Sequence, residues 1–225
     1  HVIEDRRAVM RPDLPAAGTY DTLAGLTQYV YDTAGLLLKT ISPLAGTTQY
    51  TYDGLGRVRT QTDDKGRLTT TEYDDTNQRT LVTQANGLLT TQTFDRAGRL
   101  VWIDQTNAAG LGLGRTVYSY DADGRLAMTQ DPTGVRHWAL FDDAGRQVGA
   151  IDGDGTLTET VYDAAGLALR TITYATRVDT SRLVDGSGLP TRPTLASLRP
   201  AVTAQDQSTW RTYDAANRLV KVKSE

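Results

Sequence analysis

Short segments of mixed hydrophobic and polar residues alternate with turn signals at a nearly constant spacing along the chain. Eight times an aromatic residue and an aspartate are followed, after two variable positions, by glycine or asparagine. Five of the seven steps between successive aromatics are 21 residues, and the others are 26 and 51. Such a period predicts a repeat protein whose units bury their faces against neighbouring units. The aromatic, aspartate and final residue of the eight copies are Tyr31, Asp32, Gly35; Tyr52, Asp53, Gly56; Tyr73, Asp74, Asn77; Phe94, Asp95, Gly98; Tyr120, Asp121, Gly124; Phe141, Asp142, Gly145; Tyr162, Asp163, Gly166; and Tyr213, Asp214, Asn217.

Aspartate followed three residues later by glycine is typical of a type I turn that closes a β-hairpin. The carboxylate accepts a backbone N–H across such a turn, and the glycine adopts positive φ at the bulge. In two copies Asn77 and Asn217 replace the glycine, and asparagine is among the few residues that enter the left-handed region at low cost. We therefore predict that the repeated residues shape hairpin turns.

A second turn signal lies near the middle of most units, at 42–46, 63–66, 85–87, 131–134 and 152–155. Each unit then holds two strands of roughly six to seven residues and two turns. The expected fold class is all-β, with tandem antiparallel β-hairpins of period 21. About sixteen strands would span ~75 Å at ~4.8 Å spacing. Open sheets of more than about ten strands rarely stay uncurled, so we expect a curved, spiralling sheet.

Polar residues occupy both faces of many of these strands, as in 67–73 and 90–94. A sandwich would need one consistently apolar face. The pattern instead favours a single-layer wall that is wetted on both sides.

At this point the residues resemble a known family. The run Gly46 to Val58, GTTQYTYDGLGRV, resembles the YD-repeat phrase of Rhs proteins, and the resemblance extends from about residue 20 to residue 223. It implies that the sheet is part of a hollow shell, as in bacterial Rhs polymorphic toxins, the B and C components of insecticidal toxin complexes, and teneurins. In the bacterial relatives the shell encloses a toxic C-terminal domain, which implies a secreted or cell-surface protein.

Composition adds mainly exclusions. The net charge of −3 lacks the basic excess expected of a protein that binds nucleic acid or an anionic membrane surface. Cysteine is absent, which removes disulfides and thiolate chemistry, and no apolar run is long enough to span a bilayer. We expect residues 1–225 to be a single YD-repeat array, without a signal peptide, that is a segment of a longer shell.

One stretch departs from the period. Residues 179–208 form a Pro-rich insertion between repeats, with Pro190, Pro193 and Pro200. Within it, 194–199 could form a helical turn capped by Thr194. We interpret the segment as a surface insertion, with a plug or a partner contact as the alternative. The five-residue excess at 107–112 is interpreted as a longer hairpin loop.

The candidate chemistry is sparse. The repeated aspartates share one turn context, whereas an acid–base pair needs two carboxyls in different environments. Residues 152–155 partly match a calcium loop but lack the required glutamate. The phrase at 131–134 resembles the Asp-Pro-x-Gly phrase near the Rhs autoproteolytic site, yet it falls in a mid-unit turn. His137 takes a strand position, and nothing beside it indicates a triad. We expect no enzyme activity, no cofactor and no metal.

The sequence therefore predicts a non-enzymatic shell segment that encloses or presents a C-terminal toxin or effector region. Its expected partners are the remainder of its own shell and that enclosed domain. The alternative is an extracellular recognition module that binds carbohydrate or a partner surface, since Tyr29, Tyr50 and Tyr118 add aromatic rings to the face of the repeated tyrosines.

Overall fold

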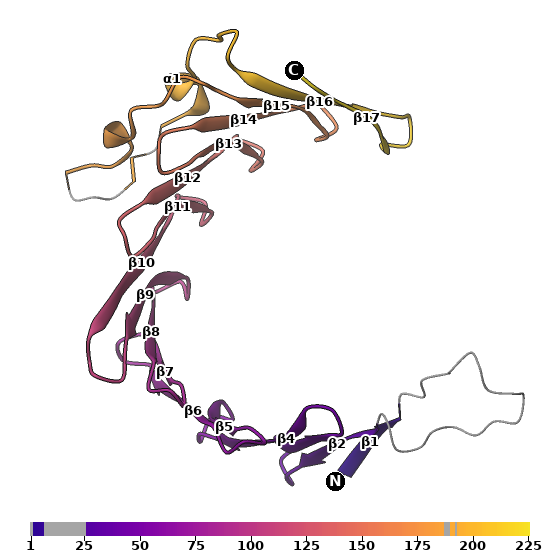
Figure 1. Ribbon diagram of the computed structural model, residues 1–225, viewed down its shortest axis with the longest axis vertical. Helices are drawn as coiled ribbons and strands as arrows, with labels where there is room; N and C mark the ends of the chain where they lie inside the picture. The colour runs from indigo at the N-terminus through magenta and orange to yellow at the C-terminus, as the bar shows by residue number, and fades with distance from the viewer. Residues whose placement is uncertain (1, 7–25, 187–189, 192) are drawn as a thin grey trace, which may run out of the picture. The chain divides into compact units, whose positions relative to one another are not determined.

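The computed structural model describes residues 2–6, 26–186, 190–191 and 193–225 (Figure 1). Its chain divides into two compact units. Unit 1 comprises residues 1–99 and 103–113, and unit 2 comprises residues 100–102 and 114–225. The strands of unit 1 are β1 (Val2–Arg6), β2 (Leu26–Tyr31), β3 (Leu37–Ser42), β4 (Gly46–Tyr52), β5 (Val58–Thr62), β6 (Leu68–Asp74), β7 (Arg79–Thr83) and β8 (Leu89–Phe94).

Strands β9 (Leu100–Thr106) and β10 (Gly112–Tyr120) contain the boundary between the units. Unit 2 continues with β11 (Leu126–Gln130), β12 (Arg136–Phe141), β13 (Gln147–Ile151), β14 (Leu157–Tyr162), β15 (Ala168–Thr173), β16 (Gln207–Tyr213) and β17 (Leu219–Ser224). A 3₁₀ helix, η1 (Thr180–Leu183), and one turn of α-helix, α1 (Leu195–Leu198), lie between β15 and β16.

Every strand pair with an assigned register is antiparallel and joins strands that are consecutive in sequence. In unit 1 the registers run from β1–β2 to β7–β8, and in unit 2 from β10–β11 to β16–β17. This confirms the all-β fold of tandem antiparallel hairpins.

The hairpin turns have one recurring geometry. At Tyr52 the register shifts by one residue, so that Tyr52 lies opposite Val58 and the turn closes with the Gly56 N–H donated to the Asp53 carbonyl at 3.1 Å. Gly56 has a φ of 78°. In the six copies that end in glycine the glycine φ is positive, and Asn217 has a φ of 61°.

The third repeat differs from this geometry. Asn77 does not have a positive φ; its neighbour Gln78 does, at 54°. Strand β6 extends to Asp74, which pairs with Arg79, so this turn holds one residue more than the others. The asparagine was expected to replace the glycine in the turn, and the extra residue moves the left-handed position one step along the chain.

The five additional residues near residue 110 were expected to form a longer hairpin loop, and this expectation is wrong. Residues 107–111 form the ordinary turn, with the Gly110 N–H donated to the Asn107 carbonyl and Asn107 Oδ1 accepting two backbone N–H groups. The additional residues lie in the strands, since β9 has 7 residues and β10 has 9. Gly114, with a φ of 121°, lies within β10.

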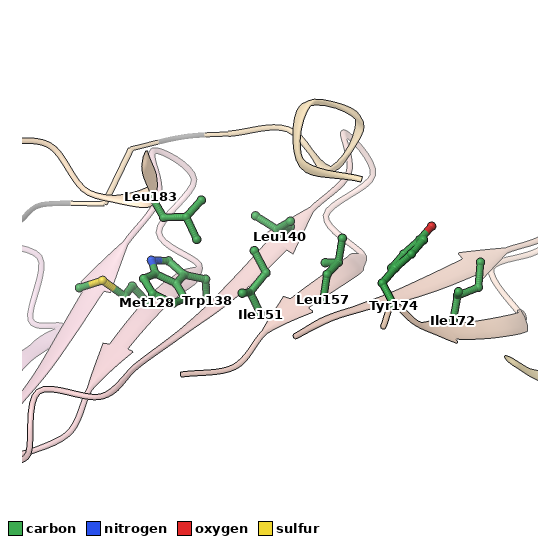
Figure 2. Packing of buried hydrophobic residues seen from close by; sticks show 8 residues of the cluster. All are labelled: Met128, Trp138, Leu140, Ile151, Leu157, Ile172, Tyr174 and Leu183. Carbon is green, nitrogen blue, oxygen red and sulfur yellow. The ribbon is translucent and has the colours of Figure 1, made fainter. Parts of the chain in front are cut away.

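The two units differ in how they are buried. In the described part of unit 1, Thr93 is the one residue that is buried. Most residues on both faces of its strands are partly exposed, as the polar pattern predicted. Unit 2 contains a cluster of eight buried apolar residues, shown in Figure 2: Met128, Trp138, Leu140, Ile151, Leu157, Ile172, Tyr174 and Leu183.

The segment between β15 and β16 covers this cluster. Leu183 of η1 is fully buried, and Val178, Val184, Leu195 and Leu198 pack against the cluster from the same segment. Gly149 of β13 leaves the room for α1, because a Cβ there would lie 3.3 Å from Leu195 Cδ1. Figure 2 shows the buried side chains between the strands and this segment. The residues interpreted as a surface insertion therefore form a second layer over one face of the sheet.

Candidate functional site: the junctions between repeats

Each turn aspartate organises its own hairpin. Asp53 Oδ1 accepts the backbone N–H groups of Leu55 at 2.9 Å and Arg57 at 3.0 Å, and Asp53 Oδ2 accepts Arg57 Nε–H at 2.8 Å. The N–H of Arg57 and its guanidinium hold the pKa of the Asp53 carboxyl below its ordinary value. The arginine four residues after the aspartate thus fixes the carboxylate as an anion.

The same pair of side chains recurs wherever the sequence reads Gly-Arg or Asn-Arg after the turn. Ion pairs between the aspartate and the arginine four positions later are formed by Asp95 and Arg99, Asp121 and Arg125, Asp142 and Arg146, and Asp214 and Arg218. The mid-unit turn at Asp63 and Arg67 repeats it. The spacing of Asp and Gly alone indicates no role for these arginines, although the repeated Gly-Arg dipeptide is a signal from which they could be found.

The tyrosine of each repeat reaches back to the repeat before it. Tyr52 Oη–H donates to the carbonyl of Leu37 at 2.6 Å, and Leu37 is the first residue of the strand that follows the previous turn. Four other tyrosines do the same to the corresponding residue: Tyr73 to Val58, Tyr120 to Leu100, Tyr162 to Gln147, and Tyr213 to Ala168. Phe94 and Phe141 have no hydroxyl and cannot form this bond.

In three repeats the arginine extends forward to the aromatic ring of the next repeat. The Arg57 guanidinium lies 4.0 Å from the centroid of the Tyr73 ring, and Arg125 and Arg146 lie 4.7 and 4.9 Å from the rings of Phe141 and Tyr162. A guanidinium over an aromatic face is attracted by the ring quadrupole. At two junctions, those of Tyr73 and Tyr162, the forward contact of the arginine and the backward bond of the tyrosine occur together.

The arginines also contact the next turn directly. Arg125 Nη1 donates to the carbonyl of Asp142 at 3.4 Å, and Arg146 Nη1 donates to the carbonyl of Asp163 at 3.2 Å. Arg57 instead binds the carboxylate of Asp75 through both of its terminal nitrogens. Here the next turn is the larger one, in which Asp74 accepts from Asn77 Nδ2 and Arg79.

Two copies lack the arginine. In the first and seventh repeats a leucine follows the glycine, and Leu36 and Leu167 donate their N–H groups to Asp32 and Asp163. The structure thus places five of the predicted tyrosines against a strand of the preceding repeat, and it places three arginines that were not predicted against the following ring. It does not bring the eight aspartates together: among the described residues, no group of three or more His, Asp or Glu side chains is arranged to hold a metal. His137 is exposed on β12.

A second polar cluster joins the covering segment to the sheet. Glu159 of β14 is buried, and its carboxylate accepts Tyr174 Oη–H at 2.7 Å and two N–H groups of Arg199, at 2.8 and 2.7 Å. Burial alone would raise the pKa of Glu159, but the bonds from Arg199 and Tyr174 outweigh it and the pKa is lowered. Burial and the neighbouring carboxylate raise the pKa of Tyr174 to about 12. No sequence pattern indicated this contact.

The fold is an array of tandem antiparallel hairpins whose junctions are formed by the residues of the Tyr-Asp repeat. Residues 20–110, which are 91 of the 225 residues, match the family model described as Teneurin YD-shell. This match confirms the resemblance to YD-repeat shell proteins. A comparison with curated proteins found no match.

Two solved structures show a looser likeness. The crystal structure of TcdB2-TccC3 without hypervariable C-terminal region is 16% identical, with a TM-score of 0.47, over 94% of this chain and 13% of that chain. The Photorhabdus luminescens Tc holotoxin pore is 15% identical, with a TM-score of 0.45, over 89% of this chain and 12% of that chain. The chain thus spans about an eighth of each, and at these TM-scores neither likeness supports a conclusion about function.

The described residues contain no helix of the length and apolarity needed to cross a membrane.

Proposed function

We propose that this chain is a non-enzymatic wall segment of a secreted or cell-surface shell, and that the shell encloses or presents a C-terminal toxin or effector region. The observation that supports the proposal is the junction chemistry. Most of the Tyr-Asp hairpins are joined to a neighbouring one by a tyrosine hydroxyl bond, by an arginine that contacts the following ring or turn, or by both. Such a wall extends one repeat at a time, since each unit contacts only its neighbours.

The hydrogen bonds of the turn aspartates are also an argument against a catalytic role. The pKa values of the Asp53, Asp95 and Asp142 carboxyls are lowered, chiefly by the backbone N–H of the arginine that follows each of them. A general acid would need a raised pKa and a partner carboxyl in a different environment. The aspartates are used in stabilising turns, which fits a wall.

The carbohydrate-binding alternative has no comparable support. Five of the repeated tyrosines donate their hydroxyls to backbone carbonyls of the preceding repeat. The hydroxyl hydrogens of these tyrosines are thus used within the wall, and we do not propose this function.

Containment can be tested in the full-length gene product. An epitope tag is placed at the end of the region that follows the repeats, and an antibody is used to capture the protein under native conditions. We expect the native full-length protein to escape capture, while the same tagged region expressed alone is captured efficiently. Denatured full-length protein should be captured as well and serves as the control. Equal capture of the native full-length protein and the separate region would show that the wall does not enclose it.

A further inference from the structure

A polar pocket lies between two successive mid-unit turns of unit 1. It has a volume of about 370 Å³ and lies beside the turn that joins β5 to β6 and the turn that joins β7 to β8. Six of its lining side chains are polar: Gln61, Asp63, Arg67, Thr69, Gln84 and Asn86. Gln61 of β5 and Thr69 of β6 lie directly opposite each other in the register. The pocket is therefore rich in groups that form hydrogen bonds.

The pocket is a gap between turns that pack closely elsewhere. A Cβ on Gly46, in the preceding mid-unit turn, would lie 2.4 Å from Asp64 Cβ of the next one. A Cβ on Gly87 would likewise lie 2.5 Å from Ala108 Cβ. Gly66 occupies the same position in its own turn, yet no atom of the described chain lies within 4 Å of a Cβ built there. The turns on either side of the pocket are thus spread apart, which leaves its lining side chains accessible.

The glutamine side chains of the pocket are not used within the protein. Asp63 at the first position of its turn accepts two backbone N–H groups. Gln84 takes that position in the following turn, where glutamine does not form the turn that aspartate and asparagine form. Asn86 accepts the Leu88 N–H there instead, at 3.0 Å. The exposed side chains of Gln61 and Gln84 have no hydrogen-bond partner in the part of the chain that the structure describes.

Arg67 adds a guanidinium with two unused nitrogens. Its Nε–H donates to Asp63 Oδ2 at 2.6 Å, and its Nη1 and Nη2 have no partner among the described residues. Arg57 shows what the same group binds one turn earlier. Its Nε–H donates to Asp53, while its Nη1 and Nη2 donate to the two carboxylate oxygens of Asp75, at 2.7 and 3.1 Å. A turn arginine that is paired with one carboxylate can therefore hold a second one.

We propose that this pocket is a binding site for a carboxylate group. Nη1 and Nη2 of Arg67 donate to the two carboxylate oxygens, as those of Arg57 do, because the planar guanidinium matches a carboxylate in two parallel hydrogen bonds. The amides of Gln61 and Gln84 bind the polar groups next to the carboxylate. The carboxylate belongs to a small organic acid or to an acidic side chain of a peptide, which present the same group to Arg67. The site functions whether or not the shell encloses a cargo.

NMR of the whole chain at about pH 7 and constant ionic strength tests the site. Succinate is the first probe, and we expect saturable shifts of the Arg67 Nε–H and of the side-chain amides of Gln61 and Gln84. Two other arginines in the same spectrum are controls. The terminal nitrogens of Arg57 are already occupied, and Arg218 has the same ion pair with its turn aspartate but is 80% exposed. Neither should show a saturable shift.

Further probes distinguish the two sources of the carboxylate. The peptide acetyl-Ala-Glu-Ala-amide carries its single carboxylate on the glutamate side chain. Saturation at a lower concentration by this peptide would assign the site to an acidic side chain, and tighter binding of succinate would assign it to a small organic acid. Succinamide and acetyl-Ala-Gln-Ala-amide have similar shapes without the charge, and we expect neither to bind.

Three variants test the residues of the pocket. Arg67→Lys keeps the charge but removes the paired donors, so it should weaken binding by about tenfold. Gln84→Ala should weaken binding by about twofold to tenfold through the loss of one hydrogen bond. Because the Gln84 side chain has no partner in the described protein, this change should leave the fold intact. Arg57→Lys is the matched control and should leave the affinity unchanged.

Three results would overturn the proposal. Shifts at Arg218 as large as those at Arg67 would show a general attraction of anions to exposed arginines. Binding of the uncharged amides as tight as that of the carboxylates would show that the charge is not recognised. A titration curve that neither Arg67→Lys nor Gln84→Ala changes would show that binding takes place elsewhere.

Discussion

At the scale of single residues, the aspartate of each turn acts on its own backbone. Asp53, Asp95 and Asp121 each accept the N–H of the residue two positions on and that of the residue four positions on. These bonds fix the turn without help from the rest of the molecule. The other local requirement is a residue with positive φ at the end of the turn. Glycine provides it in six repeats, and Gln78 and Asn217 provide it in the other two.

Gln78 is the residue at which this requirement costs most. Its φ of 54° places a long side chain in a region that L-residues enter at a cost of about 1–2 kcal/mol. We expect Gln78→Gly to raise the free energy of unfolding by about 0.5–1 kcal/mol, because part of that strain is offset by the greater entropy of glycine in the unfolded chain. Urea denaturation measures the change.

Asn77→Gly is the matched control for Gln78→Gly. Asn77 lacks a positive φ and donates its side-chain amide to both oxygens of Asp74. Its replacement should lower stability by about 0.5–1.5 kcal/mol. If Asn77→Gly stabilised the protein and Gln78→Gly did not, the left-handed position would lie at Asn77 after all.

The lowered pKa values of the turn aspartates predict how stability depends on pH. Their folded pKa values lie below the unfolded value of about 3.9, so the folded state binds fewer protons. This stabilisation is present above about pH 4 to 5 and is lost as the pH falls through the folded pKa values. We expect the urea midpoint to change little between about pH 7 and 5 and to fall steeply below about pH 4. A midpoint that rises on acidification would contradict this assignment.

At the scale of elements, the segment between β15 and β16 is attached by a buried side-chain contact, by backbone hydrogen bonds such as that from the Val178 N–H to the Gly155 carbonyl, and by an apolar layer. Arg199 ends α1 and binds Glu159 of β14, whose side chain is 6% exposed. A buried carboxylate that loses its partner retains its desolvation cost. The attachment of the segment therefore depends on both members of the pair.

Arg199→Ala tests this attachment. We expect it to lower the free energy of unfolding by about 1–3 kcal/mol, less than for a fully buried pair because the Arg199 side chain is 44% exposed. Adding Glu159→Gln should cost less than the sum of the two single changes, since the two side chains share one interaction. Arg182→Ala is the control within the same segment. Its ion pair with Asp179 joins side chains that are 83 and 59% exposed, so it should change stability by about 0.5 kcal/mol or less.

At the scale of the whole molecule, the two units are stabilised differently. The eight buried apolar residues all lie in unit 2, where the segment between β15 and β16 covers one face of the sheet. The described part of unit 1 is a single layer held by backbone ladders and by the junctions between repeats. Local opening should be easier where few apolar contacts must be broken.

Hydrogen exchange measured over the whole chain should show this difference. We expect the amides of β12, β13 and β14 to exchange more slowly than those of β4, β5 and β6. Both sets of strands are paired by antiparallel ladders, so the backbone pairing alone predicts no difference between them. The covered cluster is the reason for the difference. Equal protection in the two sets would show that the ladder and the junctions, rather than the cluster, determine stability.

The sequence by itself determined the parts of this protein that depend on near neighbours. The turn positions and the carboxylate bonds arise between residues two to four positions apart, so a pattern of Asp and Gly at that spacing is sufficient. Even there it misplaced the left-handed residue of the third repeat, because one inserted residue changes the turn without changing the period.

Only the tertiary structure decided the contacts between distant residues. The Tyr52 hydroxyl bond spans 15 residues, and the bond between Arg199 and Glu159 spans 40. Neither partner carries a local signal that identifies the other. The apolar residues of the 179–208 segment read as those of a surface loop until the face of β11 to β15 was available to pack against. Their role depends on burial against another layer, which is a property of the assembled chain and not of its local pattern.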